Sequence, residues 1–234
     1  IIGILFTMLL PNIMRAKKTS EAAVCRSNQS QLFKAGMLFS NDNKGHIVYC
    51  GYQDGKSAHH YSYDDLLAPY LGRKLTQNEI DMEWFDKEVP ELKCPSSPIK
   101  RTIGNWRTPD VPGITRSYAM NAGWSVQEKD QPDGRLSDGI TTGYYTPESG
   151  NVSTFLSRLI DTGDLLYSGE RHIDTNAVGR KNLSGLGSLG DLGDPAHPGL
   201  KSNYIFVDGH ADALLLDHAK SKYPRRNRDT YRYN

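Results

Sequence analysis

The sequence predicts an α+β protein in which one long N-terminal helix packs on a small antiparallel β-sheet body with long loops. The helix is indicated by residues 1–45, which contain a single proline and apolar residues at heptad-like spacing. The sheet is indicated by the rest of the chain, where short β-prone runs alternate with turns. The 234 residues are enough to bury a hydrophobic core, and 22 glycines and 12 prolines predict the long loops.

The N-terminal helix is expected to run from residue 1 to about residue 43, a length of roughly 64 Å at 1.5 Å per residue. Pro11 removes one backbone hydrogen bond, so we expect the helix to be kinked or locally melted there. The sequence Asn-Asp-Asn-Lys-Gly at residues 41–45 is typical of a helix C-terminus. Apolar residues recur along this helix on a heptad-like stripe that consists of Ala22, Cys25, Leu32, Gly36 and Phe39.

The first turns of this helix are expected to project, because a body of under 200 residues is only about 35 to 40 Å across. Exposing each of their large apolar side chains to water forgoes on the order of 1.5 to 3 kcal/mol, so this end requires a membrane or other copies of the chain. The alternative is a short helix folded back onto the core. The apolar residues concerned are Ile1, Ile2, Ile4, Leu5, Phe6, Met8, Leu9 and Leu10.

The charge is nearly balanced as a total but strongly partitioned along the chain. The net charge of +1 excludes a uniformly basic nucleic-acid coat and an acidic tail protein. Residues 1–14 are uncharged, residues 15–45 carry +4, residues 46–219 carry −8 and residues 220–234 carry +5. This partition predicts a basic tail that clasps the acidic body of a neighbouring copy, with no nucleic acid as partner. The tail arginines are Arg225, Arg226, Arg228 and Arg232.

The three cysteines, Cys25, Cys50 and Cys94, are too few for a disulfide scaffold and lack the C-x-x-C spacing of a zinc site. At most one disulfide can form among them. Three pairings, and the alternative of three reduced buried thiols, are compatible with the sequence.

The clearest β-structure is a hairpin near the C-terminus. Residues 204–207 and 210–216 are β-prone and flank Asp208-Gly209, a two-residue turn sequence that requires positive φ at both positions. We therefore expect a tight two-residue hairpin at this point.

The first 45 residues resemble the N-terminal stem of type IV pilin-like proteins with a prepilin-type methylation domain. The resemblance is carried by an apolar run that contains Gly3 and Pro11, and by the Cys25-x-x-Asn28 and Asn-Asp-Asn patterns of one bacterial group related to type II secretion pseudopilins. In that family the processing site Phe-Thr-Leu-Ile-Glu is expected upstream of Ile1, so processing and N-methylation are implied by resemblance alone.

The rest of the chain also resembles this group, at scattered positions. Its members have a His-x9-Asp-Gly motif, and here His197 precedes Asp208-Gly209 by ten intervening residues, one more than in the motif. Residues 93–96 and 117–121 resemble its Cys-Pro-Ser and Tyr-x-Met-Asn segments. The paired cysteines of the group match Cys25 and Cys94, which implies a disulfide between stem and body, with Cys50 outside it.

The resemblance implies a structural subunit and not an enzyme. The expected segments are a stem (1–45), a globular α+β head (46–219) and a basic tail (220–234). The stem would pack in the core of a helical pilus-like filament (fimbrium) at the cell surface, made of copies of the chain, after anchoring in the inner membrane before assembly. The alternatives are a minor pseudopilin of a type II secretion-like machine and a membrane-tethered metal- or glycan-binding domain. In the filament, the core-forming residues of the stem would be Ile1, Ile2, Gly3, Ile4, Leu5, Phe6, Met8, Leu9, Leu10 and Pro11.

Several sequence patterns are typical of enzymes or metal sites, but each is weaker evidence than the resemblance of the stem. Residues 185–190 match G-x-G-x-x-G but run into DLGDPAHPG, which cannot form the required helix. His197, Asp208 and His210 could converge on zinc, and Asp191 with Asp194 could bind calcium, although a full calcium-loop spacing is missing. We therefore expect no cofactor, with calcium as the alternative. The glycan alternative rests on aromatic residues Tyr52, Tyr61, Tyr63 and Tyr70 with His59 and His60.

Overall fold

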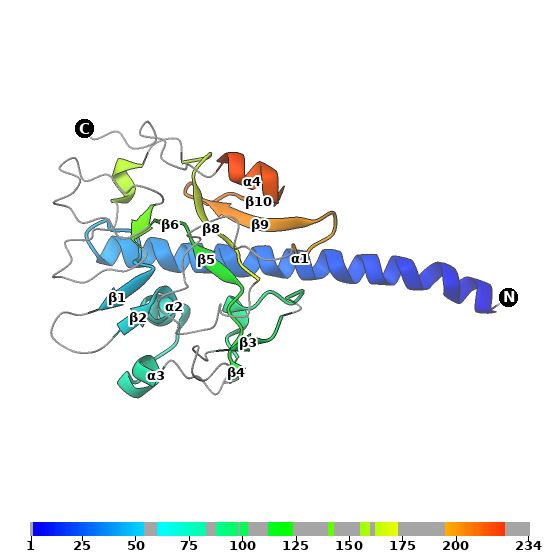
Figure 1. The fold of residues 1–234 in the computed structure, drawn as a ribbon, viewed down its shortest axis with the longest axis horizontal. Coiled ribbons are helices and arrows are strands. Elements are labelled where there is room, and N and C mark those ends of the chain that lie inside the picture. The colour runs from blue at the N-terminus through cyan, green and yellow to red at the C-terminus, as the bar shows by residue number, and fades with distance from the viewer. Residues whose placement is uncertain are drawn as a thin grey trace.

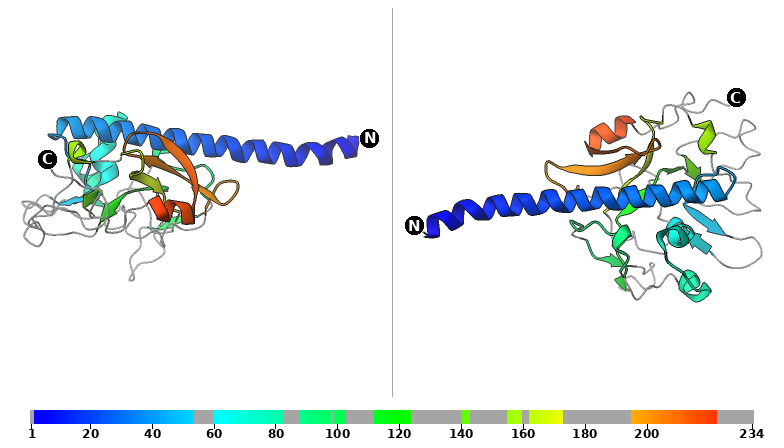
Figure 2. Two further views of the ribbon diagram at one scale, coloured as in Figure 1. Left: turned by 90° about the horizontal axis from the view of Figure 1, so that it is seen from above. Right: turned by 180° about the vertical axis from the view of Figure 1, so that it is seen from behind.

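The computed structural model describes residues 2–53, 60–82, 88–97, 99–102, 112–123, 140–142, 155–159, 162–172 and 195–222. It has the expected α+β architecture, in which one long helix, α1 (Ile2–Asp42), lies along one face of a body that contains a small antiparallel sheet. Viewed from above, α1 borders the body and its N-terminal half extends well beyond it (Figures 1 and 2).

Helix α1 is continuous through Pro11, so the expectation of a locally melted segment there is wrong. A proline removes one N–H donor, and this loss is tolerated because the other bonds of the ladder remain and this part of the helix faces solvent. At the other end the helix stops as predicted. Lys44 and Gly45 adopt positive φ, and the N–H of Gly45 donates to the carbonyl of Ser40 at 2.8 Å.

The main sheet has four antiparallel strands in the order β10-β9-β8-β5. Its strands are β5 (Tyr118–Met120), β8 (Leu166–Glu170), β9 (Lys201–Phe206) and β10 (Ala211–Leu215). Helix α1 covers one face, and the short helix α4 (Leu216–Lys222) covers the other (Figure 2). Alternation along the strands matches this layering: Ile205 belongs to the core beneath α1, whereas Tyr204 and Phe206 belong to the cluster with α4.

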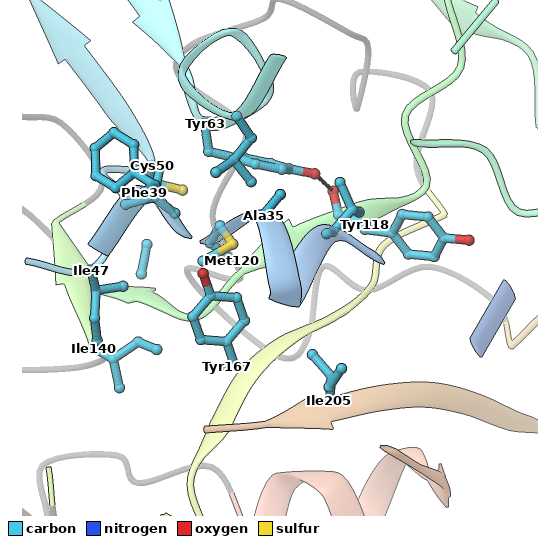
Figure 3. Close-up of a cluster of buried hydrophobic side chains, with 14 of the residues drawn as sticks. Ala35, Phe39, Ile47, Cys50, Tyr63, Tyr118, Met120, Ile140, Tyr167 and Ile205 are labelled. Atoms are coloured by element: carbon cyan, nitrogen blue, oxygen red, sulfur yellow. Dashed lines mark hydrogen bonds between the residues drawn. The ribbon is translucent and has the colours of Figure 1, made fainter. Parts of the chain in front are cut away.

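The predicted apolar stripe of α1 forms the centre of the core. Cys25, Leu32, Gly36 and Phe39 are buried, and Ala22 is half-buried. Figure 3 shows side chains from α1, the sheet and the loops after α1 converging in this cluster. Its labelled members include Ala35, Phe39, Ile47, Tyr63, Tyr118, Met120, Tyr167 and Ile205.

The remaining elements are short and lie around α1 and the sheet. On the side of α1 away from β9 and β10, strands β1 (Gly51–Gln53) and β2 (His60–Ser62) form a two-stranded antiparallel pair followed by α2 (Tyr63–Leu67) (Figure 1). The others are η1 (Ala68–Leu71), α3 (Gln77–Met82), η2 (Pro90–Leu92), β3 (Arg101–Thr102), β4 (Pro112–Gly113), β6 (Ala122–Gly123), β7 (Thr141–Thr142) and η4 (Leu156–Arg158).

The C-terminal hairpin is present, but its turn differs from the predicted one. Strands β9 and β10 pair from Ala211↔Ile205 to Leu215↔Lys201. Of the two turn residues, Gly209 alone has positive φ, at 90°. Its N–H donates to the carbonyl of Phe206 at 2.9 Å, so the loop spans four residues between the strands and Asp208 keeps an ordinary backbone conformation.

Gly36 of α1 lies directly against the side chain of Tyr167 in β8, and a Cβ atom at this position would collide with the Tyr167 hydroxyl. We expect Gly36→Ala to lower the free energy of unfolding by about 1–3 kcal/mol, although alanine favours helices, because the overpacked ring has no free space. The Tyr167 hydroxyl is buried and has no hydrogen-bond partner among the described residues. Tyr167→Phe should therefore be nearly neutral and should recover part of the loss in the double variant. Urea denaturation measures all three, and an additive double variant would contradict the proposed collision.

Candidate functional site

The N-terminal half of α1 stands free of the body (Figure 2). Every side chain that the structure describes between residues 7 and 20 is exposed. Leu9, Leu10, Ile13 and Met14 are each more than half exposed. Their spacing of three and four residues places them on one side of the helix, so they form a continuous apolar stripe in contact with water.

Contacts between α1 and the body begin about two turns after this stripe. The hydroxyl of Ser96 donates to the carboxylate of Glu21 at 2.9 Å, and the Asn203 amide lies 3.5 Å from the carbonyl of Ala22. From there to Asp42 one side of the helix is covered by the body. The structure thus divides α1 into an exposed part and a packed part at about residue 21.

No helix in the described part of the chain is both long enough and apolar enough to cross a membrane. The side chains of Ile2, Gly3, Ile4, Leu5, Phe6 and Met8, and the whole of Ile1, lie outside the described residues. The exposed stripe defined here therefore consists of Leu9, Leu10, Ile13 and Met14.

The packed part of α1 is attached to the body by a disulfide and by amide side chains. Cys25 and Cys94 form the disulfide that the resemblance implies, with their Cα atoms 5.0 Å apart, and Cys50 is buried outside it. One turn further along α1, the Asn28 amide donates to the carbonyls of Pro90 and Lys93, both at 2.9 Å. These bonds fix the segment that carries Cys94 against the helix.

A buried polar cluster surrounds the disulfide. His197 Nε2 lies 3.6 Å from the sulfur of Cys94 and 2.7 Å from Oε1 of Glu170. The Asn203 amide donates to the same carboxylate oxygen at 2.9 Å, and His172 Nε2 lies 3.4 Å from the other oxygen. These side chains come from β8, β9 and the segments next to them, so the tertiary fold alone brings them together.

The carboxylate of Glu170 is fully buried yet remains ionised. Burial alone would raise its pKa, but the hydrogen bonds and charges of His172 and His197 outweigh burial and lower the pKa to about 2. Glu170 therefore supplies a negative charge directly beside the disulfide.

A second buried ionic cluster lies at the start of α2. Arg116 is completely buried and forms an ion pair of 2.5 Å with Asp64. Asp65 accepts hydrogen bonds from the backbone and hydroxyl of Ser62, at 2.8 and 2.9 Å. Burial and the charge of Asp64 raise the pKa of Asp65 to about 7. The guanidinium also lies over the ring of Tyr63, 5.2 Å from its centroid.

The structure does not bring together the three residues considered for zinc. His197 contacts Glu170 and Cys94 on the approach to β9, whereas Asp208 and His210 pair with each other at 2.7 Å in the turn that follows β9. A strand of six residues separates the two places. The suggested His197–Asp208–His210 site is therefore wrong, although His197 does lie among other side chains whose atoms could bind a metal.

Sequence reasoning missed Glu170, His172, Asn203, Asp64 and Arg116. Charged and amide side chains normally face water, and nothing in the spacing of these residues signals burial. The other predicted positions lie outside the described residues: the glycine-rich segment 185–190, the calcium candidates Asp191 and Asp194, and the tail residues Arg225, Arg226, Arg228 and Arg232.

The fold and these sites define an α+β protein with a projecting N-terminal helix stapled to its body by a disulfide. No protein-family model, curated protein or solved structure matches this chain.

Proposed function

We propose that the protein is a structural subunit of a type IV pilus-like filament at the cell surface, which polymerises through α1. The observation that carries this proposal is the apolar stripe at Leu9, Leu10, Ile13 and Met14, which nothing in the described part of the chain covers. Burying each such side chain against neighbouring stems contributes on the order of 1.5–3 kcal/mol. Association of several stems would therefore favour a polymer strongly.

The attachment of α1 to the body suits a subunit that must transmit load along a filament. The stem continues into the body as the same uninterrupted helix, and the Cys25–Cys94 disulfide joins it covalently to the body. In a filament the stems would form the core and the bodies the outer layer. Before assembly the stem would be held in the inner membrane.

The charge partition supports the same arrangement. The basic stem segment and tail and the acidic body are complementary between neighbouring copies. In this proposal the tail of one subunit contacts the body of the next, and the chain's partners are copies of itself.

Changing Ile13 to aspartate should abolish polymerisation, because a carboxylate would have to be buried between stems. Deletion of residues 1–14 should have the same effect. Leu200→Asp is the matched control, because Leu200 is also a large apolar residue that is exposed to solvent. It lies in a turn of the body, and its positive φ is one that aspartate tolerates. Negative-stain electron microscopy and sedimentation after detergent removal report on assembly.

Filaments of normal length and yield from the Ile13→Asp variant would exclude the stem as the assembly surface. Loss of filaments in both Ile13→Asp and Leu200→Asp would mean that any new surface charge blocks assembly, which also contradicts the proposal. Filament length separates the two family-level alternatives, because a minor pseudopilin would form short assemblies where a pilus subunit forms long ones.

A further inference from the structure

Four buried side chains with metal-ligating atoms meet where α1 joins the body. The sulfurs of Cys25 and Cys94, a carboxylate oxygen of Glu170 and a ring nitrogen of His197 all lie within 4.8 Å of one another. They come from four separate segments: α1, the loop after η2, strand β8 and the segment before β9. The cluster is therefore a product of the tertiary fold.

The donor set is one that zinc accepts. Zinc takes four ligands in tetrahedral geometry from cysteine, histidine and carboxylate side chains. Around such an ion, a sulfur at 2.3 Å and a nitrogen at 2.0–2.1 Å are about 3.6 Å apart. His197 Nε2 and the Cys94 sulfur are separated by 3.6 Å. The short contact between His197 and Glu170 would have to open by only about 0.6 Å for both to bind the same ion.

A disulfide by itself does not account for these neighbours. A disulfide carries no charge, whereas burying a carboxylate is costly unless it is paired. Glu170 nevertheless lies in the cluster, held by His172 and Asn203 as well as by His197. Such outer partners are what orient a carboxylate ligand in a metal site.

We propose that, when Cys25 and Cys94 are reduced, the chain binds one Zn²⁺ through Cys25, Cys94, Glu170 and His197. Disulfide and zinc are then alternative links between α1 and the body, in oxidised and reduced protein respectively. His172 and Asn203 position Glu170 without contacting the ion. This site is independent of the filament function and does not rest on it.

Reduction of the Cys25–Cys94 disulfide is a balanced reaction with a phosphine reductant such as TCEP. The phosphine takes up the oxygen of one water molecule, and two electrons and two protons pass to the sulfurs to give two thiols. Zinc binding then displaces both thiol protons to the solvent, because the thiolate is the ligand form. The Cα separation of 5.0 Å leaves room for the two sulfurs to move apart to the about 3.8 Å expected around zinc.

The experiment compares zinc content in the two states of the full chain. Protein is reduced with TCEP, freed of reductant without oxygen, incubated with zinc sulfate, gel-filtered and analysed by mass spectrometry of the metal. We expect one zinc per reduced chain and none per oxidised chain. Cobalt substituted for zinc should show the visible bands of a tetrahedral site with thiolate ligands.

Three variants test the ligand set. His197→Ala and Glu170→Gln should each weaken zinc binding by more than the 10- to 100-fold typical of outer partners. His210→Ala is the matched control, since His210 also pairs with a carboxylate but on the surface, and it should bind zinc like the parent. Circular dichroism of each reduced variant reports whether the fold persists.

Absence of zinc from the reduced parent would overturn the proposal, whether that protein is folded or unfolded. Equal zinc affinity and unchanged cobalt spectra in His197→Ala and Glu170→Gln would also overturn it, because binding would then need only the thiolates. A reduced chain that unfolds with a chelator and refolds with zinc would support it.

Discussion

Replacing Arg116 by methionine should lower the free energy of unfolding by about 3–5 kcal/mol, enough to unfold a protein of ordinary stability. Methionine fills similar space, so the loss is electrostatic. Arg116 is completely buried and is bonded to Asp64, which is buried as well. Without the guanidinium, a buried carboxylate keeps its cost of desolvation and loses its partner.

The effect should depend on pH in a defined direction. Asp65, next to Asp64, has its pKa raised to about 7. Because this pKa is higher in the folded protein than in the unfolded chain, the folded state binds the proton more tightly. The resulting contribution to the free energy of unfolding is complete below the pKa of the unfolded chain and is lost as pH rises through about 7. Without Arg116 the two carboxylates repel each other more strongly, so we expect a larger loss at pH 8 than at pH 5. Urea denaturation of the parent and of Arg116→Met at both pH values measures this difference in the free energy of unfolding.

Lys93→Met is the matched control for Arg116→Met. Lys93 and Glu88 form an ion pair of the same length, 2.5 Å, but both side chains are substantially exposed. Breaking an exposed pair costs about 0–1 kcal/mol. Similar losses in the two variants would show that burial of the Arg116 pair does not determine its energy.

Removing the disulfide is the second large effect, with an expected loss of about 4 kcal/mol from the entropy of closing a loop of this size. The disulfide joins residues 69 apart in the sequence. Alanine at both Cys25 and Cys94 avoids leaving a buried hydroxyl at either position. Urea denaturation with a chelator present measures the loss without any contribution from metal.

Reduction of the parent protein in the same chelator should lower its stability by a similar amount. The Cys25→Ala/Cys94→Ala variant should not respond to reductant, whereas Cys50→Ala should respond like the parent because Cys50 is outside the disulfide. If the double variant is as stable as the oxidised parent, the disulfide is not a principal link between α1 and the body.

The sequence predicted the long helix well because its evidence is local. A 3.5-residue apolar spacing, a C-terminal Asn-Asp-Asn-Lys-Gly and the lack of breakers other than Pro11 act within a few turns. The continuous helix through Pro11 is the exception, since one missing hydrogen bond cannot break a helix whose neighbouring turns remain intact. The hairpin was found for the same local reason, although its turn type was wrong.

The two buried polar clusters could not be predicted in this way. Arg116 and Asp64 are 52 residues apart, and Glu170 and His197 are 27 apart. Each residue in isolation looks like a surface residue, because only pairing with its buried partner offsets the cost of removing it from water. The Cys25–Cys94 pairing was reached through family resemblance, because three pairings were equally open from the residues.

By itself the sequence determined the elements whose causes are short-range: α1 with its buried stripe, its C-terminus, the apolar residues of its first turns and the β9–β10 hairpin. The tertiary structure decided where α1 leaves the body, so that Leu9, Leu10, Ile13 and Met14 are exposed while Cys25 is buried. It also decided that Glu170 and His197 meet the cysteines. The physical reason is that burial and charge pairing depend on which distant segments fold together, and no local pattern records that choice.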